Sequence, residues 1–261
     1  MTNRHHNMLF QMTGLTRKRD TMLHKLLLTT ALAIGLTSAA EARLQLTINA
    51  SGSTFTCFDG QLGCDLSGGA NNLLLVDQTV GAAFVQIALA QSAFGAINQL
   101  QLSSSNIVNN GATPVTVTLL ASDTDFVGPV HAINNSGSLT FNQNIGAPDS
   151  TLKFWADAAN LQGANPLNTP GTLLESVSGH AVTDPDSFAG SKIAAFDAAG
   201  PYSMTEGAAL ILRSGGSITG FNQAMESTAI PEPKTWAMLG LGFGLMALLG
   251  YRKRKDRLQT I

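Results

Sequence analysis

The chain has 261 residues, enough for one sizeable domain together with targeting segments. Only 12% of these residues are charged, against roughly 25% in an average soluble domain. Residues 43–228 hold four Lys/Arg against thirteen Asp/Glu, whereas the segments on either side carry an excess of cations. Such an acidic body argues against nucleic acid as a partner, because phosphate binding needs clustered cations.

Residues 22–42 have the three parts of an export signal. A short charged start, Met22–Lys25, precedes the apolar run Leu26–Leu36, and Ala40-Glu-Ala42 then forms a small-residue exit of the A-x-A type. We therefore expect the general export machinery to translocate the chain and signal peptidase to cut between Ala42 and Arg43. An uncleaved membrane helix is a weaker alternative, because this apolar run is short for a bilayer.

Two points about this signal stay open. Ser38-Ala-Ala40 offers a second cleavage pattern. Residues 1–21 are polar and basic, so they are either a long extension of the charged region or lie upstream of a true start at Met22.

Residues 43–228 are dominated by a period of two, as expected for an extracytoplasmic all-β domain. Apolar and polar residues alternate in five runs, which is the pattern of strands with one buried face: 84–89, 115–119, 139–142, 152–155 and 208–213. Clusters of Gly, Asn, Ser and Pro separate the runs. Eight or more such strands predict an antiparallel β-sandwich.

Two local interpretations complete this prediction. The stretch Ser187–Ala199 is the one candidate for a short helix. Tyr202–Glu206 and Gly215–Thr219 are expected to form a strand pair, followed by a spacer at Glu226–Ile230.

The C-terminal segment, residues 229–261, has the features of a membrane anchor. An uncharged stretch from Thr235 to Tyr251 would span about 25 Å as a helix, the short end of what crosses a bilayer. Trp236 and Tyr251 stand at its two ends, where amphipathic rings prefer the interface. The cations after it predict a cytoplasmic stop and therefore an external body: Arg252, Lys253, Arg254, Lys255 and Arg257.

Three features in order give this segment a specific resemblance. Pro231-Glu232-Pro233, a glycine-punctuated apolar helix and a terminal basic cluster together resemble the PEP-CTERM sorting signal, although Lys234 replaces the alanine common in that family. The resemblance implies recognition of Pro231, Glu232 and Pro233 by the membrane protease exosortase. It also implies a Gram-negative origin and a link to exopolysaccharide or biofilm matrix. A plain C-terminal anchor is the alternative.

Cys57 and Cys64 are the chain's two cysteines, seven positions apart. In an exported chain this spacing predicts a disulfide that closes a small loop. A metal pair is the alternative, but no further cysteine or nearby histidine completes such a site.

The remaining candidate side chains are aspartates and histidines, which are either metal ligands or simply solvated surface residues. Asp123-Thr-Asp125 and Asp184-Pro-Asp186 could offer carboxylates to Ca²⁺, but the spacing of a complete EF-hand loop is absent. His131 and His180 are far apart in the sequence, which predicts two separate surface residues.

Catalytic motifs are missing from the sequence. No Gly-x-Ser-x-Gly, His-Glu-x-x-His or phosphate-binding loop occurs. Within the body, residues 43–228, Glu175 and Glu206 are the only glutamates before Glu226, which leaves few candidates for the paired carboxylates of a glycoside hydrolase. A lectin would use more rings than Trp155 and Tyr202. We therefore expect no enzyme, no metal site and no cofactor.

These observations favour an exported structural protein of the cell surface or extracellular matrix. We expect the protein to be an inner-membrane-anchored precursor at first and to be located outside the cell after exosortase processing. A polysaccharide- or calcium-binding surface module is the alternative, and a secreted hydrolase is a weaker one.

Overall fold

The computed structural model describes residues 44–163 and 169–228, together with Leu241 and Phe243. The expected export signal, the sorting motif and most of the predicted membrane helix lie outside these residues. Within the described part of the chain, no helix has the length and apolar character needed to cross a membrane.

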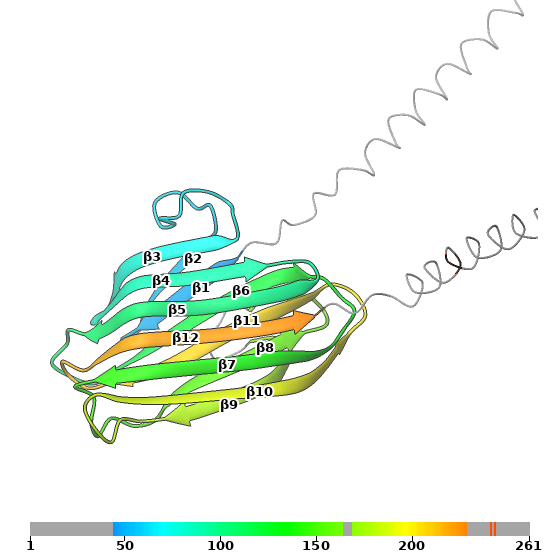
Figure 1. The fold of residues 1–261 in the computed structure, drawn as a ribbon. Helices are drawn as coiled ribbons and strands as arrows, with labels where there is room; N and C mark the ends of the chain where they lie inside the picture. Colours follow the sequence, from blue (N-terminus) through cyan, green and yellow to red (C-terminus); the bar gives the residue numbers. More distant parts are fainter. Residues whose placement is uncertain (1–43, 164–168, 229–240, 242, 244–261) are drawn as a thin grey trace, which may run out of the picture. The chain divides into compact units, whose positions relative to one another are not determined.

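Twelve antiparallel strands form two six-stranded sheets that pack face to face (Figure 1). The first sheet has the order β2-β1-β6-β11-β8-β9, and the second has the order β10-β7-β12-β5-β4-β3. The strands are β1 (Gln45–Ala50), β2 (Ser53–Phe58), β3 (Leu73–Val80), β4 (Ala83–Ala93), β5 (Ile97–Asn109), β6 (Val115–Phe126), β7 (Val130–Asn142), β8 (Ser150–Asp157), β9 (Thr172–Gly179), β10 (Asp186–Ala198), β11 (Tyr202–Leu212) and β12 (Ser217–Thr228). The predicted all-β antiparallel sandwich is thus confirmed for the body.

The period-two pattern of the sequence sets the inner faces of these sheets. In β6, Val117 and Leu119 are buried while Thr116 is exposed. β8 follows the same alternation throughout, and β11 follows it only from Ala208 to Leu212. Side chains of successive strand residues point to opposite faces, so one apolar set from each sheet meets its counterpart in a shared core.

Within β4 the alternation changes phase, at a place that the sequence pattern does not mark. Val85 is buried in β4, but farther along the buried positions are Ala88 and Ala90, while Leu89 is only partly buried. The neighbouring strand β5 shifts in step. There, the Ser104 and Ser105 hydroxyls both donate to the carbonyl of Gln86, at 2.9 and 3.1 Å. The prediction that Val85 and Leu89 share one face was therefore wrong.

The predicted helix at Ser187–Ala199 was also wrong, because this segment is strand β10. It pairs with β7 from Asp186 opposite Phe141 to Ala198 opposite Val130, with one irregularity after Ala195. Small alanines and serines permit a helix locally, but the Phe188 ring packs against Phe141 at 5.8 Å between centroids, and this inward contact requires a strand.

The expected pairing of Tyr202–Glu206 with Gly215–Thr219 does not occur, since β11 and β12 belong to different sheets. The chain crosses from one sheet to the other at residues 213–216. There the Asn109 amide donates to the carbonyls of Leu212 and Arg213, at 3.3 and 2.8 Å, and so holds the crossing in place. β12 continues to Thr228, so most of the expected spacer is strand.

Polar side chains cross the centre of the core in both directions. From β12, the buried Gln223 amide donates to the carbonyls of Lys153 and Gly207 in the opposite sheet, each at 3.2 Å. From β11, Glu206 is 0% exposed, and no hydrogen-bond partner for either carboxyl oxygen occurs among the described residues. Burial raises the pKa of Glu206 well above its usual range, and the backbone N–H groups of Met225 and Leu102 act against this rise.

A second carboxyl, Asp123 of β6, joins the two sheets near one end. Its Oδ2 accepts a hydrogen bond of 2.5 Å from the hydroxyl of Ser92 in β4. Burial raises the pKa of Asp123 to about 6, against the opposing effect of this hydrogen bond.

The raised pKa of Asp123 makes the stability of the fold depend on pH. The unfolded chain titrates this group near pH 3.9. The contribution of Asp123 to the free energy of unfolding is therefore fully present below about pH 3.9. It is lost as pH rises through about 6, a loss of about 3 kcal/mol. We expect Asp123→Asn, which keeps a partner for Ser92, to remove this part of the pH dependence, as measured by urea unfolding between pH 4 and 8.

The control for this measurement is Asp77→Asn, a carboxylate of β3 that is exposed to solvent. Its pH profile should follow that of the wild type. An unchanged pH slope in Asp123→Asn would contradict the assignment.

Candidate functional site

The acidic pairs proposed as calcium ligands are already occupied by protein donors. The Asp125 carboxylate accepts from the Asn160 amide at 2.5 Å, and Asp184 accepts from the backbone N–H of Gln143 at 2.8 Å. Asp186 accepts backbone hydrogen bonds from Val182, Thr183 and Ser187, which lower the pKa of its carboxyl. Within residues 44–163 and 169–228, no group of three or more His, Cys, Asp or Glu side chains could hold a metal ion.

The two histidines lie apart on the surface and each contacts one carboxylate. His131 pairs with Asp197 across β7 and β10, and His180 pairs with Asp149 at 2.6 Å. In all four residues the side chain is about half exposed or more. Neither pair has a nearby hydroxyl or thiol among its hydrogen-bond partners, so neither has the arrangement that activates a nucleophile.

Glu175 and Glu206 do not form a pair of the kind that glycoside hydrolysis requires. In the register of the first sheet, Phe154 stands between them, opposite Glu206 on one side and Glu175 on the other. The carboxyl of Glu206 is enclosed in the core, where no substrate reaches it.

The rings of Tyr202 and Trp155, the two weighed as sugar contacts, are both engaged in packing. Tyr202 is fully buried and its hydroxyl is hydrogen bonded to Ser227. The Trp155 ring covers Gly207, where an added Cβ would lie 2.8 Å from the ring. Leu120 lies 3.4 Å from the same added Cβ, so the ring and this leucine pack beside Gly207 on the outer face of the first sheet.

An open groove of about 490 Å³ lies on the second sheet, over β7, β10 and β12. Its lining consists of uncharged residues, most of them small: Ser136, Gly137, Ser138, Ala189, Gly190, Ser191 and Asn222. The register places Ser138 opposite both Ala189 and Asn222, so hydroxyl and amide groups from three strands stand side by side. Such groups can hydrogen bond to the hydroxyls of a sugar.

Sequence reasoning missed this groove, because its residues come from segments up to 86 positions apart that only the sheet register joins. The two Ser-Gly-Ser and Ala-Gly-Ser triplets were the available signal, but without the register nothing showed that they are neighbours.

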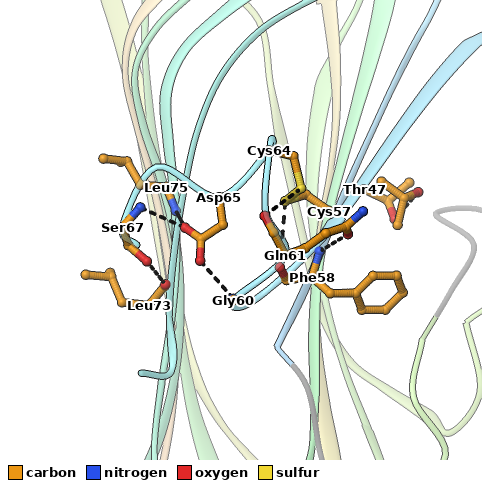
Figure 2. Close-up of a disulfide and its surroundings, with 11 residues drawn as sticks. Thr47, Cys57, Phe58, Gly60, Gln61, Cys64, Asp65, Ser67, Leu73 and Leu75 are labelled. Carbon is orange, nitrogen blue, oxygen red and sulfur yellow. Dashed lines mark hydrogen bonds between the residues drawn. A yellow bond between two sulfur atoms is a disulfide. The ribbon is translucent and has the colours of Figure 1, made fainter. Parts of the chain in front are cut away.

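The predicted disulfide between Cys57 and Cys64 is present (Figure 2). It closes the start of a long connection from β2 in the first sheet to β3 in the second. Cys57 is fully buried, so the bond anchors this connection to the core.

Asp65 organises the rest of the same connection, as Figure 2 shows. Its carboxylate accepts backbone hydrogen bonds from Gly60 and Ser67, at 2.9 and 2.8 Å, and a longer one of 3.3 Å from Leu75. Burial would raise the pKa of Asp65, but these hydrogen bonds outweigh it and lower the pKa below its usual value.

The connection leaves two leucine side chains in solvent, those of Leu62 and Leu66. Leu62 lies between the two cysteines and is 97% exposed. Asp59 fixes the far end of the loop by accepting from the backbone N–H of Asn72 at 2.8 Å. The loop is therefore held by side-chain acceptors at both ends, and its two carboxylates are engaged by backbone donors.

We expect the double variant Cys57→Ser/Cys64→Ser to lose about 2–3 kcal/mol of unfolding free energy, because an open loop restores entropy to the unfolded chain. Urea unfolding monitored by circular dichroism measures this loss. A reductant should lower the midpoint of the wild type and leave the midpoint of the double variant unchanged. Equal midpoints for the oxidised wild type and the double variant would contradict the assigned role of the disulfide.

The residues assigned to targeting lie outside the described part of the chain. They are Ala42 and Arg43 at the expected signal cleavage, Pro231, Glu232 and Pro233 in the motif, Trp236 and Tyr251 at the helix ends, and the basic stop from Arg252 to Arg257. Their roles remain predictions from the sequence.

Comparison with solved structures finds only distant likenesses. A carbohydrate-binding module, TmCBM61 in complex with β-1,4-galactotriose, is 11% identical, with 54% of this chain and 87% of that chain covered and a TM-score of 0.29. A structure of infectious bursal disease virus, Gx strain, is 14% identical, with 74% and 57% covered and a TM-score of 0.33. The K2 cleaved adhesin domain of Lys-gingipain is 11% identical, with 64% and 87% covered and a TM-score of 0.24.

These values are too low to transfer a ligand or an activity to this chain. A comparison with curated proteins finds no match.

Comparison with protein families gives a definite result for the C-terminal segment. The PEP-CTERM protein-sorting motif matches residues 229–255, which contain Pro231-Glu232-Pro233, the apolar stretch and most of the basic cluster. This match confirms the resemblance found in the sequence: the chain is a protein with a C-terminal PEP-CTERM sorting domain.

Proposed function

We propose that this chain is a non-enzymatic structural protein of the cell surface or extracellular matrix, which exosortase sorts and processes and which associates with exopolysaccharide. The sorting motif at residues 229–255 is the observation that carries the proposal, because it implies an exported protein that the sorting protease recognises. On this proposal the precursor leaves the cytoplasm by its export signal. The apolar helix then holds it in the inner membrane until processing releases it.

The disulfide and the charge composition of the body support a location outside the cytoplasm. Disulfides persist in oxidising compartments, and both cysteines of this chain are joined in one. The body is also acidic and poor in charge, which suits a surface that must not bind nucleic acid.

Exopolysaccharide is the proposed matrix partner, and the groove on the second sheet is its proposed contact surface. The groove offers hydroxyl and amide groups on a rigid sheet, without charged residues in its lining. Binding by such a surface is expected to be weak for each sugar unit. A polymer can engage many copies at once, and its avidity compensates for weak single contacts.

Replacement of Pro231, Glu232 and Pro233 by alanine tests the sorting step. We expect the full-length precursor to accumulate in the membrane fraction and the released form to disappear from the medium. Intact-mass measurement of both fractions is the readout. The matched control replaces Glu226 and Thr228, two exposed positions just upstream of the match, by alanine and should be processed normally. Unchanged release of the triple variant would refute the role of the motif.

Ser191→Tyr tests the groove, because it places a large ring on one of its exposed walls. We expect about tenfold weaker retention on exopolysaccharide from the producing cells, about 1.4 kcal/mol. Thr116→Tyr is the matched control, since it adds the same ring at an exposed strand position of the other sheet. Equal retention of both variants and the wild type would remove the groove from the proposal.

A further inference from the structure

The edge strands β9 and β10 come together along one side of the sandwich (Figure 1). Their residues meet in antiparallel order across the two sheets. A Cβ added to Gly179 would lie 2.6 Å from the ring of Phe188, and a Cβ added to Gly190 would lie 2.8 Å from Val177.

This order continues in steps of two residues and places Glu175 opposite Lys192. Successive inward residues of a strand are two positions apart, so the pairs 179 with 188 and 177 with 190 lead to 175 with 192. One carboxyl oxygen of Glu175 is buried and has no hydrogen-bond partner among the described residues. Burial raises the pKa of Glu175, and the charge of Lys192 acts against this rise.

Asn135 of β7 is the third residue at this place. It stands directly opposite Lys192 in the β7–β10 register and is 0% exposed. Its Nδ2 donates to the carbonyls of Ile133 and Lys192, at 3.2 and 3.3 Å, while its Oδ1 is buried without a partner in the described part of the chain. The Cβ atoms of directly opposite strand residues are about 4.5–5.5 Å apart, a gap that a lysine chain can bridge.

We propose that Lys192 and Asn135 form an intramolecular amide cross-link, with Glu175 as the group that transfers the protons. The three residues bring together an amine, a carboxamide whose oxygen lacks a donor, and a carboxyl half enclosed between the sheets. Lys192 is exposed at the sheet edge, so its side chain rotates inward over Asn135 to react, and the ammonia formed leaves by the same edge.

The proposed reaction balances without an oxidant or cofactor. The Glu175 carboxylate takes a proton from the ammonium of Lys192, and the neutral Nζ attacks Cγ of Asn135. The protonated Glu175 donates to Oδ1 as the tetrahedral centre forms. Glu175 next carries the second Nζ proton to Nδ2, and the Cγ–Nδ2 bond breaks to release ammonia. As the carbonyl re-forms, Glu175 returns the Oδ1 proton to this ammonia, which leaves as ammonium. One carboxamide and one ammonium ion thus become one secondary amide and one ammonium ion.

The cross-link would fasten the side of the sandwich that lacks a disulfide. β10 is a thirteen-residue edge strand that pairs with β7 alone, and edge strands are the first to separate from a sheet. The disulfide loop lies at the opposite edge, between β2 and β3. The inference does not depend on the proposed function, because a stabilising bond would serve any exported protein.

Mass spectrometry of the purified full chain tests the proposal. Formation of the amide releases ammonia, so the reduced protein should be lighter than its sequence mass by about 17 Da. Trypsin should also fail to cut after Lys192, and the peptide ending at Lys153 should appear joined to the one spanning 154–213. A sequence mass without this loss, together with free peptides 154–192 and 193–213, would overturn the proposal.

Three variants separate the cross-link from other causes of a lighter mass. Lys192→Arg keeps the charge but cannot form this amide, so the mass loss should disappear. Glu175→Gln should leave most of the chain uncross-linked, because the proton-transfer group is lost. Lys153→Arg, on the exposed side of β8, is the matched control and should retain the full loss. Retention of the loss in Lys192→Arg would assign it to another residue pair and refute the proposal.

Discussion

The body depends on burying one face of each sheet against the other, and this requirement shapes the remainder of the molecule. Alternating residues such as Val117, Leu119 and Leu210 supply the apolar surface, and removing it from water is the main force that holds the sheets together. A sandwich of open sheets nevertheless has two sides where strand edges and core are close to solvent. The disulfide lies at one of these sides, and the proposed amide cross-link lies at the other.

The two sides are closed by different means. Between β2 and β3, the connection that carries the disulfide crosses from one sheet to the other, and Asp65 ties it to β3 through backbone hydrogen bonds. Between β9 and β10, small residues let the sheets approach closely, as the contacts beside Gly179 and Gly190 show. Lys192 also lies near the middle of this edge strand, where a charged side chain discourages pairing with another chain.

Polar groups inside the core give the packing a single register. Gln223 reaches the carbonyls of the opposite sheet, and Ser92 reaches Asp123 across the same gap. A slip of one residue would turn Gln223 to the outer face and leave the carbonyls of Lys153 and Gly207 without this donor. The core therefore combines a strong but unspecific apolar attraction with a few polar contacts that only one alignment satisfies.

The sequence by itself determined the targeting motif, the sandwich class and the disulfide, because each rests on residues that are close along the chain. The PEP-CTERM motif is contiguous, the alternation is local, and Cys57 and Cys64 are the only cysteines. Tertiary structure alone decided the rest. It made Ser187–Ala198 a strand through pairing with β7, assigned β11 and β12 to different sheets, and brought Glu175 and Asn135 to Lys192. Such contacts join residues 17 to 68 positions apart, and strand order and register, which local propensity does not encode, bring them together.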